Sequence, residues 1–192
     1  KIAMNKQTGR LYAATKGGLY YSENGNDWTK ILNGYAMDVC VGPDGSVLAA
    51  AGDSAYLSVG GNTGSWVTLT TGKAGFLPKT GIGWMTFAIA PSDANIMYAC
   101  LTNTDGKLLN LYNSIDKGAS WSIIFPANPA FEPFGSTTGY GCYSNTMTVF
   151  PNDPNQVLLG GINMWWGKKV VATGYYNWEQ VSFGGLSTDI PF

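Results

Sequence analysis

The stretch Ser114-Ile115-Asp116-Lys117-Gly118-Ala119-Ser120-Trp121 predicts a tight turn between two β-strands. Asp116 can accept hydrogen bonds from backbone N–H groups a residue or two further on, and Ser114 can do the same more weakly. Gly118 can adopt a positive φ that residues with a side chain resist. Trp121 then begins a strand and can bury a large apolar ring. The apolar runs 108–112 and 121–124 are the strands that the turn connects.

Two sets of markers recur along the chain in the same order, at intervals of about 40 to 60 residues, which indicates an internal repeat. The first marker is a tryptophan where a strand begins: Trp28, Trp66, Trp121 and Trp178. The second is a turn that leads into a short apolar strand, at 9–12, 45–48, 95–98 and 155–158. Each repeat has the pattern of four strands, and four-stranded units of this size are typical of β-propeller blades.

We therefore predict an all-β fold, a β-propeller with about four four-stranded blades in one partial domain covering residues 1–192. The blades are expected at about 1–33, 34–71, 83–126 and 143–183, and residues 184–192 resemble the start of a further blade. Because the chain begins at a strand and ends in another, we expect it to be part of a propeller with seven or more blades. A closed four-bladed ring is the alternative.

The pattern Ser-x-Asp-x-Gly-x-x-Trp resembles the Asp-box of bacterial neuraminidase repeats (BNR repeats), found also in sortilin-like and xyloglucanase-like propellers. That resemblance implies a structural role, away from any active site, for Ser114, Asp116, Gly118 and Trp121. The Pro-x-Asp-Pro-Asn turn and the run 160–165 are similar to those of sortilin-like propellers in exported Bacteroidetes surface proteins, including users of the type IX secretion route. This second resemblance implies a secreted, cell-surface or periplasmic location more than it implies an activity.

Composition excludes several classes of function. The 192 residues carry a net charge of −1 and no large lysine or arginine cluster, so nucleic acid is not an expected partner. No apolar run reaches about 18 residues, so no membrane span is expected. The absence of histidine removes Ser-His-Asp triads and most catalytic zinc sites, and we expect no metal and no cofactor. Cys40, Cys100 and Cys142 are widely spaced and form no metal-binding or redox motif; a Cys100–Cys142 disulfide stays open.

Candidate binding residues are aromatic and lie in or beside long links between strands. The link 71–83 contains Phe76, and the link 126–143 contains Phe131, Phe134 and Tyr140. Trp165 and Trp166 belong to the same end of the repeat. Long loops that carry aromatic residues suggest a surface for a glycan or a protein partner. The alternative is that these rings cover the seams between blades.

Two functions are compatible with these features. The first is an exported, non-catalytic propeller that binds a protein or glycan, or acts as a scaffold in a secretion-related assembly, with the remainder of the propeller as a further partner. The alternative is a xyloglucanase-type glycoside hydrolase, or a fragment of one, in which Asp38 and Asp189 serve as the paired acids at the mouths of innermost strands. A sialidase is disfavoured because it needs an arginine triad, and Arg10 is the single arginine of the chain.

Overall fold

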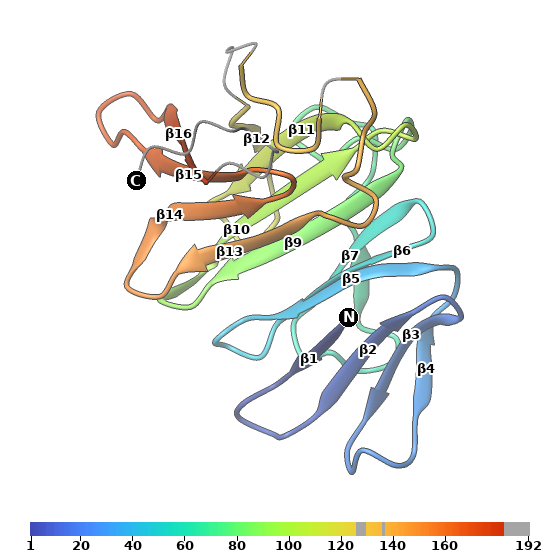
Figure 1. Cartoon of the computed structure of the whole chain (residues 1–192). Helices are drawn as coiled ribbons and strands as arrows, with labels where there is room; N and C mark the ends of the chain where they lie inside the picture. The colour runs from blue at the N-terminus through green and yellow to red at the C-terminus, as the bar shows by residue number, and fades with distance from the viewer. Residues whose placement is uncertain (126–129, 136, 183–192) are drawn as a thin grey trace.

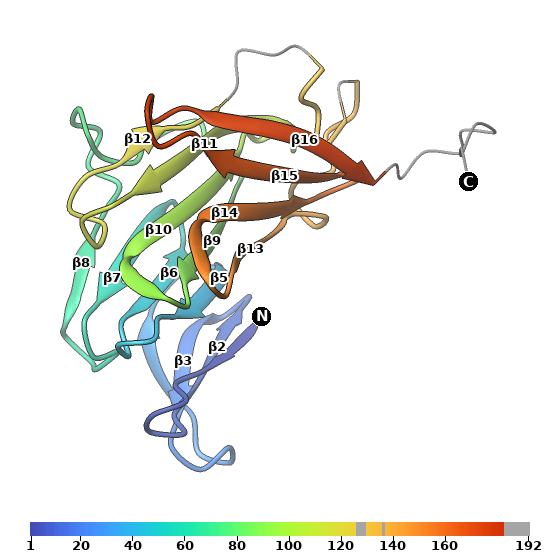
Figure 2. The same cartoon turned by 90° about the vertical axis from the view of Figure 1, so that its left-hand side faces the viewer.

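A computed structural model describes residues 1–125, 130–135 and 137–182, and every helix or strand assigned in that part of the chain is a β-strand. The strands form four antiparallel sheets, each made from four consecutive strands, which we call blades 1 to 4. Figure 1 shows the blades as a fan, and the view in Figure 2 shows them stacked from blade 1 to blade 4. The prediction of an all-β fold in four-stranded blades is confirmed.

The bounds of the strands follow the repeat. Blade 1 contains β1 (Ile2–Met4), β2 (Leu11–Thr15), β3 (Gly18–Ser22) and β4 (Thr29–Leu32). Blade 2 contains β5 (Ala36–Val41), β6 (Val47–Ala51), β7 (Ser54–Ser58) and β8 (Trp66–Thr68). Blade 3 contains β9 (Trp84–Ala90), β10 (Asp93–Thr102), β11 (Leu108–Ser114) and β12 (Ser122–Ile123). Blade 4 contains β13 (Thr146–Phe150), β14 (Asp153–Gly160), β15 (Met164–Lys169) and β16 (Tyr176–Ser182). Residues 184–192, the expected start of a further blade, lie outside the described residues.

The hydrophobic core lies in the seams between neighbouring blades. Tyr12 of blade 1 packs with Val39 of blade 2, and Leu48 of blade 2 belongs to the same cluster as Phe87 of blade 3. A further cluster joins blade 3 to blade 4 through residues that include Tyr98. Burial of apolar side chains therefore holds one sheet against the next, while backbone hydrogen bonds hold the strands within each sheet.

The loop at Ser114–Trp121 is closed by side chains. Ser114 Oγ accepts the Gly118 N–H at 2.8 Å and donates to Asp116 at 2.8 Å, and Asp116 Oδ1 accepts the Ser120 N–H at 2.8 Å. The backbone N–H that donates to Asp116 thus belongs to a residue four positions later, whereas the sequence predicts a donor one or two positions later. Gly118 has φ +80°, as the sequence predicts. Trp121 is buried but precedes β12, which begins at Ser122.

The hydrogen bond from a glycine N–H to a serine Oγ recurs in two other blades. Ser22 Oγ accepts the Gly25 N–H at 2.9 Å in blade 1, and Ser58 Oγ accepts the Gly61 N–H at 2.8 Å in blade 2. In blade 1, Asn24 takes the place of the aspartate and accepts two backbone N–H groups. The loops therefore share geometry even where the sequence pattern has weakened.

Candidate functional site

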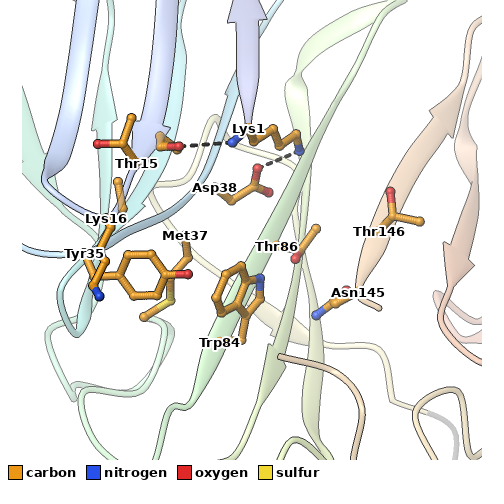
Figure 3. A pocket seen from close by; sticks show the side chains of 12 residues that line it. Lys1, Thr15, Lys16, Tyr35, Met37, Asp38, Trp84, Thr86, Asn145 and Thr146 are labelled. Carbon is orange, nitrogen blue, oxygen red and sulfur yellow. Dashed lines mark hydrogen bonds and ion pairs between the residues drawn. The ribbon is translucent and has the colours of Figure 1, made fainter. Parts of the chain in front are cut away.

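A cavity of about 380 Å³ opens where the four innermost strands, β1, β5, β9 and β13, begin (Figure 3). We call it the axial cavity. These strands are neighbours in the fan, since β5 contacts both β1 and β9, and β9 contacts β13. Every blade contributes to the lining, which includes Lys1, Lys16, Tyr35, Asp38, Trp84, Thr86, Asn145 and Thr146.

Some of these lining residues occupy one equivalent position in each blade. The innermost and second strands pair Ala3 with Tyr12, Cys40 with Leu48, Ala88 with Tyr98 and Thr148 with Leu158. The residues two positions before Ala3, Cys40, Ala88 and Thr148 are Lys1, Asp38, Thr86 and Thr146. All of these line the cavity, so it is formed by one level of the repeat.

Asp38 is held by three hydrogen-bond donors. Its Oδ1 accepts the Val39 N–H at 2.7 Å and lies 2.6 Å from Lys1 Nζ, and its Oδ2 accepts the Phe87 N–H at 2.7 Å. Val39 and Phe87 are equivalent residues of β5 and β9, so the carboxylate joins two adjacent blades. The side chain of Asp38 is only 2% exposed. These contacts favour a structural role, because a general acid or base needs a lone pair free to exchange a proton with substrate.

The rest of the axial cavity offers an aromatic pair and polar groups. Tyr35 and Trp84 lie edge to face with ring centroids 5.7 Å apart, and Tyr35 is 47% exposed. Figure 3 shows both rings beside Asp38, with Asn145 and Thr86 next to them. The Oδ1 atom of Asn145 is buried and has no hydrogen-bond partner in the described part of the chain. Its Nδ2 donates to Cys100 Sγ at 3.5 Å, and burial raises the pKa of the Cys100 thiol, which keeps it neutral.

Phe131, Phe134 and Trp165 are core residues, so the prediction that they form a contact surface is wrong. They are 3%, 1% and 5% exposed. The Phe131 ring centroid lies 4.7 Å from that of Trp165 and 5.0 Å from that of Trp178. The seam between blades 3 and 4 needs this apolar filling, so the alternative of rings that cover seams accounts for these residues.

The other predicted contact residues do not gather at one site. Tyr140 is 38% exposed and lies in the link between blades 3 and 4, whereas Phe76 lines a separate groove between blades 2 and 3. Trp166 is half-buried and lines a third hollow at the outer part of blade 4. None of them lines the axial cavity. Asp189, the second acid of the hydrolase hypothesis, lies outside the described residues.

Sequence reasoning identified Asp38 but missed Tyr35, Trp84 and Asn145. Each of the three lies at the start of an innermost strand or just before it. That position relative to the repeat was a usable signal, because the residues before equivalent strands converge when the blades pack side by side.

Residues 1–125, 130–135 and 137–182 were compared with two patterns, a cluster of metal-ligating side chains and a membrane-spanning helix. No group of three or more histidine, cysteine, aspartate or glutamate side chains in those ranges could hold a metal ion. Nor do they contain a helix that is apolar and long enough to cross a membrane. The three cysteines are free thiols, so Cys100 and Cys142 are not joined by a disulfide.

Comparison with known proteins rests on structure. No family model matches the sequence, and no curated protein matches it. The chain is similar to the GH74 xyloglucanase of Xanthomonas campestris, with a TM-score of 0.68 and 18% identity over 95% of this chain and 30% of that one. The GH74 enzyme of Niastella koreensis gives a TM-score of 0.56 and 20% identity, over 92% of this chain and 23% of that one. YCF48 bound to D1 peptide gives 0.51 and 16% identity, over 82% of this chain and 46% of that one.

The fold is that of a β-propeller. The chain spans less than half the length of each of these structures, which agrees with four blades of a larger propeller. The matches include glycoside hydrolases as well as a protein bound to a peptide, so the propeller fold is compatible with either type of function.

Proposed function

We propose that this chain is part of an exported, non-catalytic β-propeller that binds a glycan or a protein at the axial cavity. The observation that carries the proposal is the state of Asp38, the only carboxylate among the described residues of the cavity lining. Its oxygens are occupied by two backbone N–H groups and Lys1, while Tyr35, Trp84 and Asn145 present groups that a ligand can use.

The chemistry of the cavity favours a neutral glycan over the other ligands that the proposal admits. A sugar ring can pack its C–H face on Tyr35 and Trp84, and a sugar hydroxyl can donate to the buried Oδ1 of Asn145. Such a donor would remove the cost of leaving a buried acceptor without a hydrogen bond, which is about 1–3 kcal/mol.

The test is a titration of the protein with neutral β-glucan oligosaccharides, followed by tryptophan fluorescence and calorimetry. Trp84→Ala should weaken binding by about tenfold or more, because a central aromatic residue is lost from the contact. Trp28→Ala is the control, since Trp28 is 38% exposed and does not line the cavity. Equal binding by wild type and Trp84→Ala would show that the cavity is not the glycan site.

A glycoside hydrolase of xyloglucanase type is the second candidate, and the position of Asp38 in the cavity lining favours it. Incubation with β-glucans and an assay of reducing ends separates the two functions. Turnover that Asp38→Asn abolishes in a folded protein would refute the binding function. Binding to a glycan or a protein without turnover would refute the hydrolase.

The location at the cell surface or in the periplasm, and export by the type IX route, are part of the same proposal. They are supported by the loops at Ser114, Ser58 and Ser22, in each of which the serine Oγ accepts a hydrogen bond from a glycine N–H, as suits an Asp-box repeat. Fractionation of cells that produce the full-length protein tests this part: recovery in the cytoplasm alone would contradict it.

A further inference from the structure

A second hollow lies between blades 2 and 3, on the outer side of the fan. Its volume is about 580 Å³, and we call it the rim groove. One wall is the loop 72–80, and the other is formed by Tyr112, Trp121 and Ile123 of blade 3. None of the residues around it lines the axial cavity.

The loop wall is fixed in place. Gly75 O accepts the Trp121 N–H at 2.7 Å, and Leu77, which is fully buried, forms a parallel bridge with Thr70. Gly72 and Gly75 have φ of +72° and +80°, which residues with a side chain rarely adopt. The groove is thus formed by the fold itself and does not depend on closure by a ligand.

The ionised groups of the rim groove are all positive. Lys73 and Lys79 are exposed and line it, and no aspartate or glutamate does so among the described residues. Neither lysine forms an ion pair within that part of the chain. The hollow also presents Phe76 and the exposed side chain of Ile123. An occupant should therefore combine carboxylates with apolar side chains.

The backbone of Ile123 provides a further recognition feature. Ile124, the residue after β12, donates its N–H to Leu111 O at 2.9 Å, so those two residues form a hydrogen-bonded pair one step beyond the β11–β12 ladder. Hydrogen-bonded and non-hydrogen-bonded pairs alternate along antiparallel strands, so the next pair, Ile123 with Tyr112, is not hydrogen-bonded. The N–H and C=O of Ile123 consequently point away from β11, on the same side as the Trp121 N–H that meets the loop wall. An extended chain can pair with this edge.

We propose that the rim groove binds an extended, acidic peptide segment of a partner protein. The segment pairs with the N–H and C=O of Ile123, places an apolar side chain against Phe76 and Trp121, and sets carboxylates near Lys73 and Lys79. The free strand edge is what favours a peptide over an anionic polysaccharide, which has no regular backbone N–H and C=O groups to pair with it. This site is independent of any ligand of the axial cavity.

The experiment is an NMR titration of the isotope-labelled chain with a short acetylated peptide in which glutamate and leucine alternate. Binding should be saturable, should weaken as salt is added and should shift the amide signals of Ile123 and the loop 72–80. The double variant Lys73→Glu/Lys79→Glu should weaken binding by about tenfold or more, since two attractions become repulsions. Lys6→Glu/Lys168→Glu makes the same change in net charge at exposed positions away from the groove and should leave binding unchanged.

Two further probes separate a peptide from other occupants. Ile123→Pro removes the outward N–H without removing a bond of the β11–β12 ladder, and should weaken binding while amide dispersion shows an intact fold. A peptide with lysine in place of glutamate should not bind. The proposal is overturned if the folded wild type shows no saturable binding or binds the lysine peptide equally well. It is also overturned if Lys73→Glu/Lys79→Glu and Ile123→Pro both bind the acidic peptide as the wild type does. Polygalacturonate that binds as tightly as the acidic peptide, regardless of Ile123→Pro, would assign the groove to a glycan instead.

Discussion

Replacing Asp38 with alanine should destabilise the fold strongly, because the carboxylate joins two blades. The substitution leaves the N–H groups of Val39 and Phe87 without their acceptor inside the protein. Each buried donor without a partner costs about 1–3 kcal/mol. Lys1 also loses its counter-ion, but its side chain is 41% exposed and water can replace much of that interaction. We therefore expect a loss of about 2–6 kcal/mol, a large part of the 5–15 kcal/mol typical of a folded domain.

The measurement is urea unfolding followed by circular dichroism and tryptophan fluorescence. Asp38→Asn should cost about half as much as Asp38→Ala, since its amide oxygen can still accept one of the two N–H groups. Thr86→Val is the matched control: Thr86 occupies the equivalent position of blade 3 and its hydroxyl has no hydrogen bond to another described residue. That control should change the free energy of unfolding by less than about 1 kcal/mol. A loss of less than about 1 kcal/mol for Asp38→Ala would refute the role of this carboxylate as a link between blades.

Three further predictions concern the core and the ionisable groups. Phe131→Ala should cost about 3–5 kcal/mol in urea unfolding because it leaves a cavity beside Trp165, whereas Tyr175→Ala, at a side chain 77% exposed, should change stability little; equal effects would contradict the buried position of Phe131. Burial acts to raise the pKa of Asp116, but hydrogen bonds from serine side chains and backbone outweigh it and hold that pKa below its usual value. The ionised form is therefore stabilised by folding, so stability should fall as the pH drops below about 4, and Asp116→Asn should flatten this loss in unfolding curves recorded across the acid range. Burial raises the pKa of Tyr176 to about 12. The contribution of this neutral phenol to stability is therefore complete only below the pKa that the same side chain has in the unfolded chain. Stability should thus decrease as the pH rises above about 10, and ultraviolet titration should show Tyr176 ionising later than exposed tyrosines; simultaneous ionisation would contradict its burial.

The fold could be predicted from sequence because its signals are local. The turn at Ser114–Trp121 and the recurring tryptophans indicate the outermost strand of each blade, and their order along the chain indicates the blades. Only Trp66 begins its strand: Trp28 and Trp121 stand just before theirs, and Trp178 lies inside β16. The environment of each aromatic side chain could not be predicted in the same way. Phe131 and Tyr140 belong to the same link, yet one is in the core and the other is partly exposed, because the packing of blade 4 against blade 3 decides which ring is covered.

The lining of the axial cavity could not be predicted from local signals either. Tyr35, Trp84 and Asn145 are far apart in sequence, and they meet only because successive innermost strands begin at the same end of the fan. Asp38 was identified from its place before an apolar run, but its partner Phe87 belongs to the next blade. The role of the carboxylate therefore became clear only when the register of both strands was known.

The separation between hydrogen bonding within blades and side-chain packing between them has a mechanical consequence. Within the described residues, blades 1 and 4 each pack against one neighbouring blade, and blades 2 and 3 pack against two. When neighbouring blades are pulled apart, the packing between them should give way at a seam, and each blade should detach as a unit with its own strands still hydrogen-bonded. A protein built this way can absorb tension in separate steps, one seam at a time.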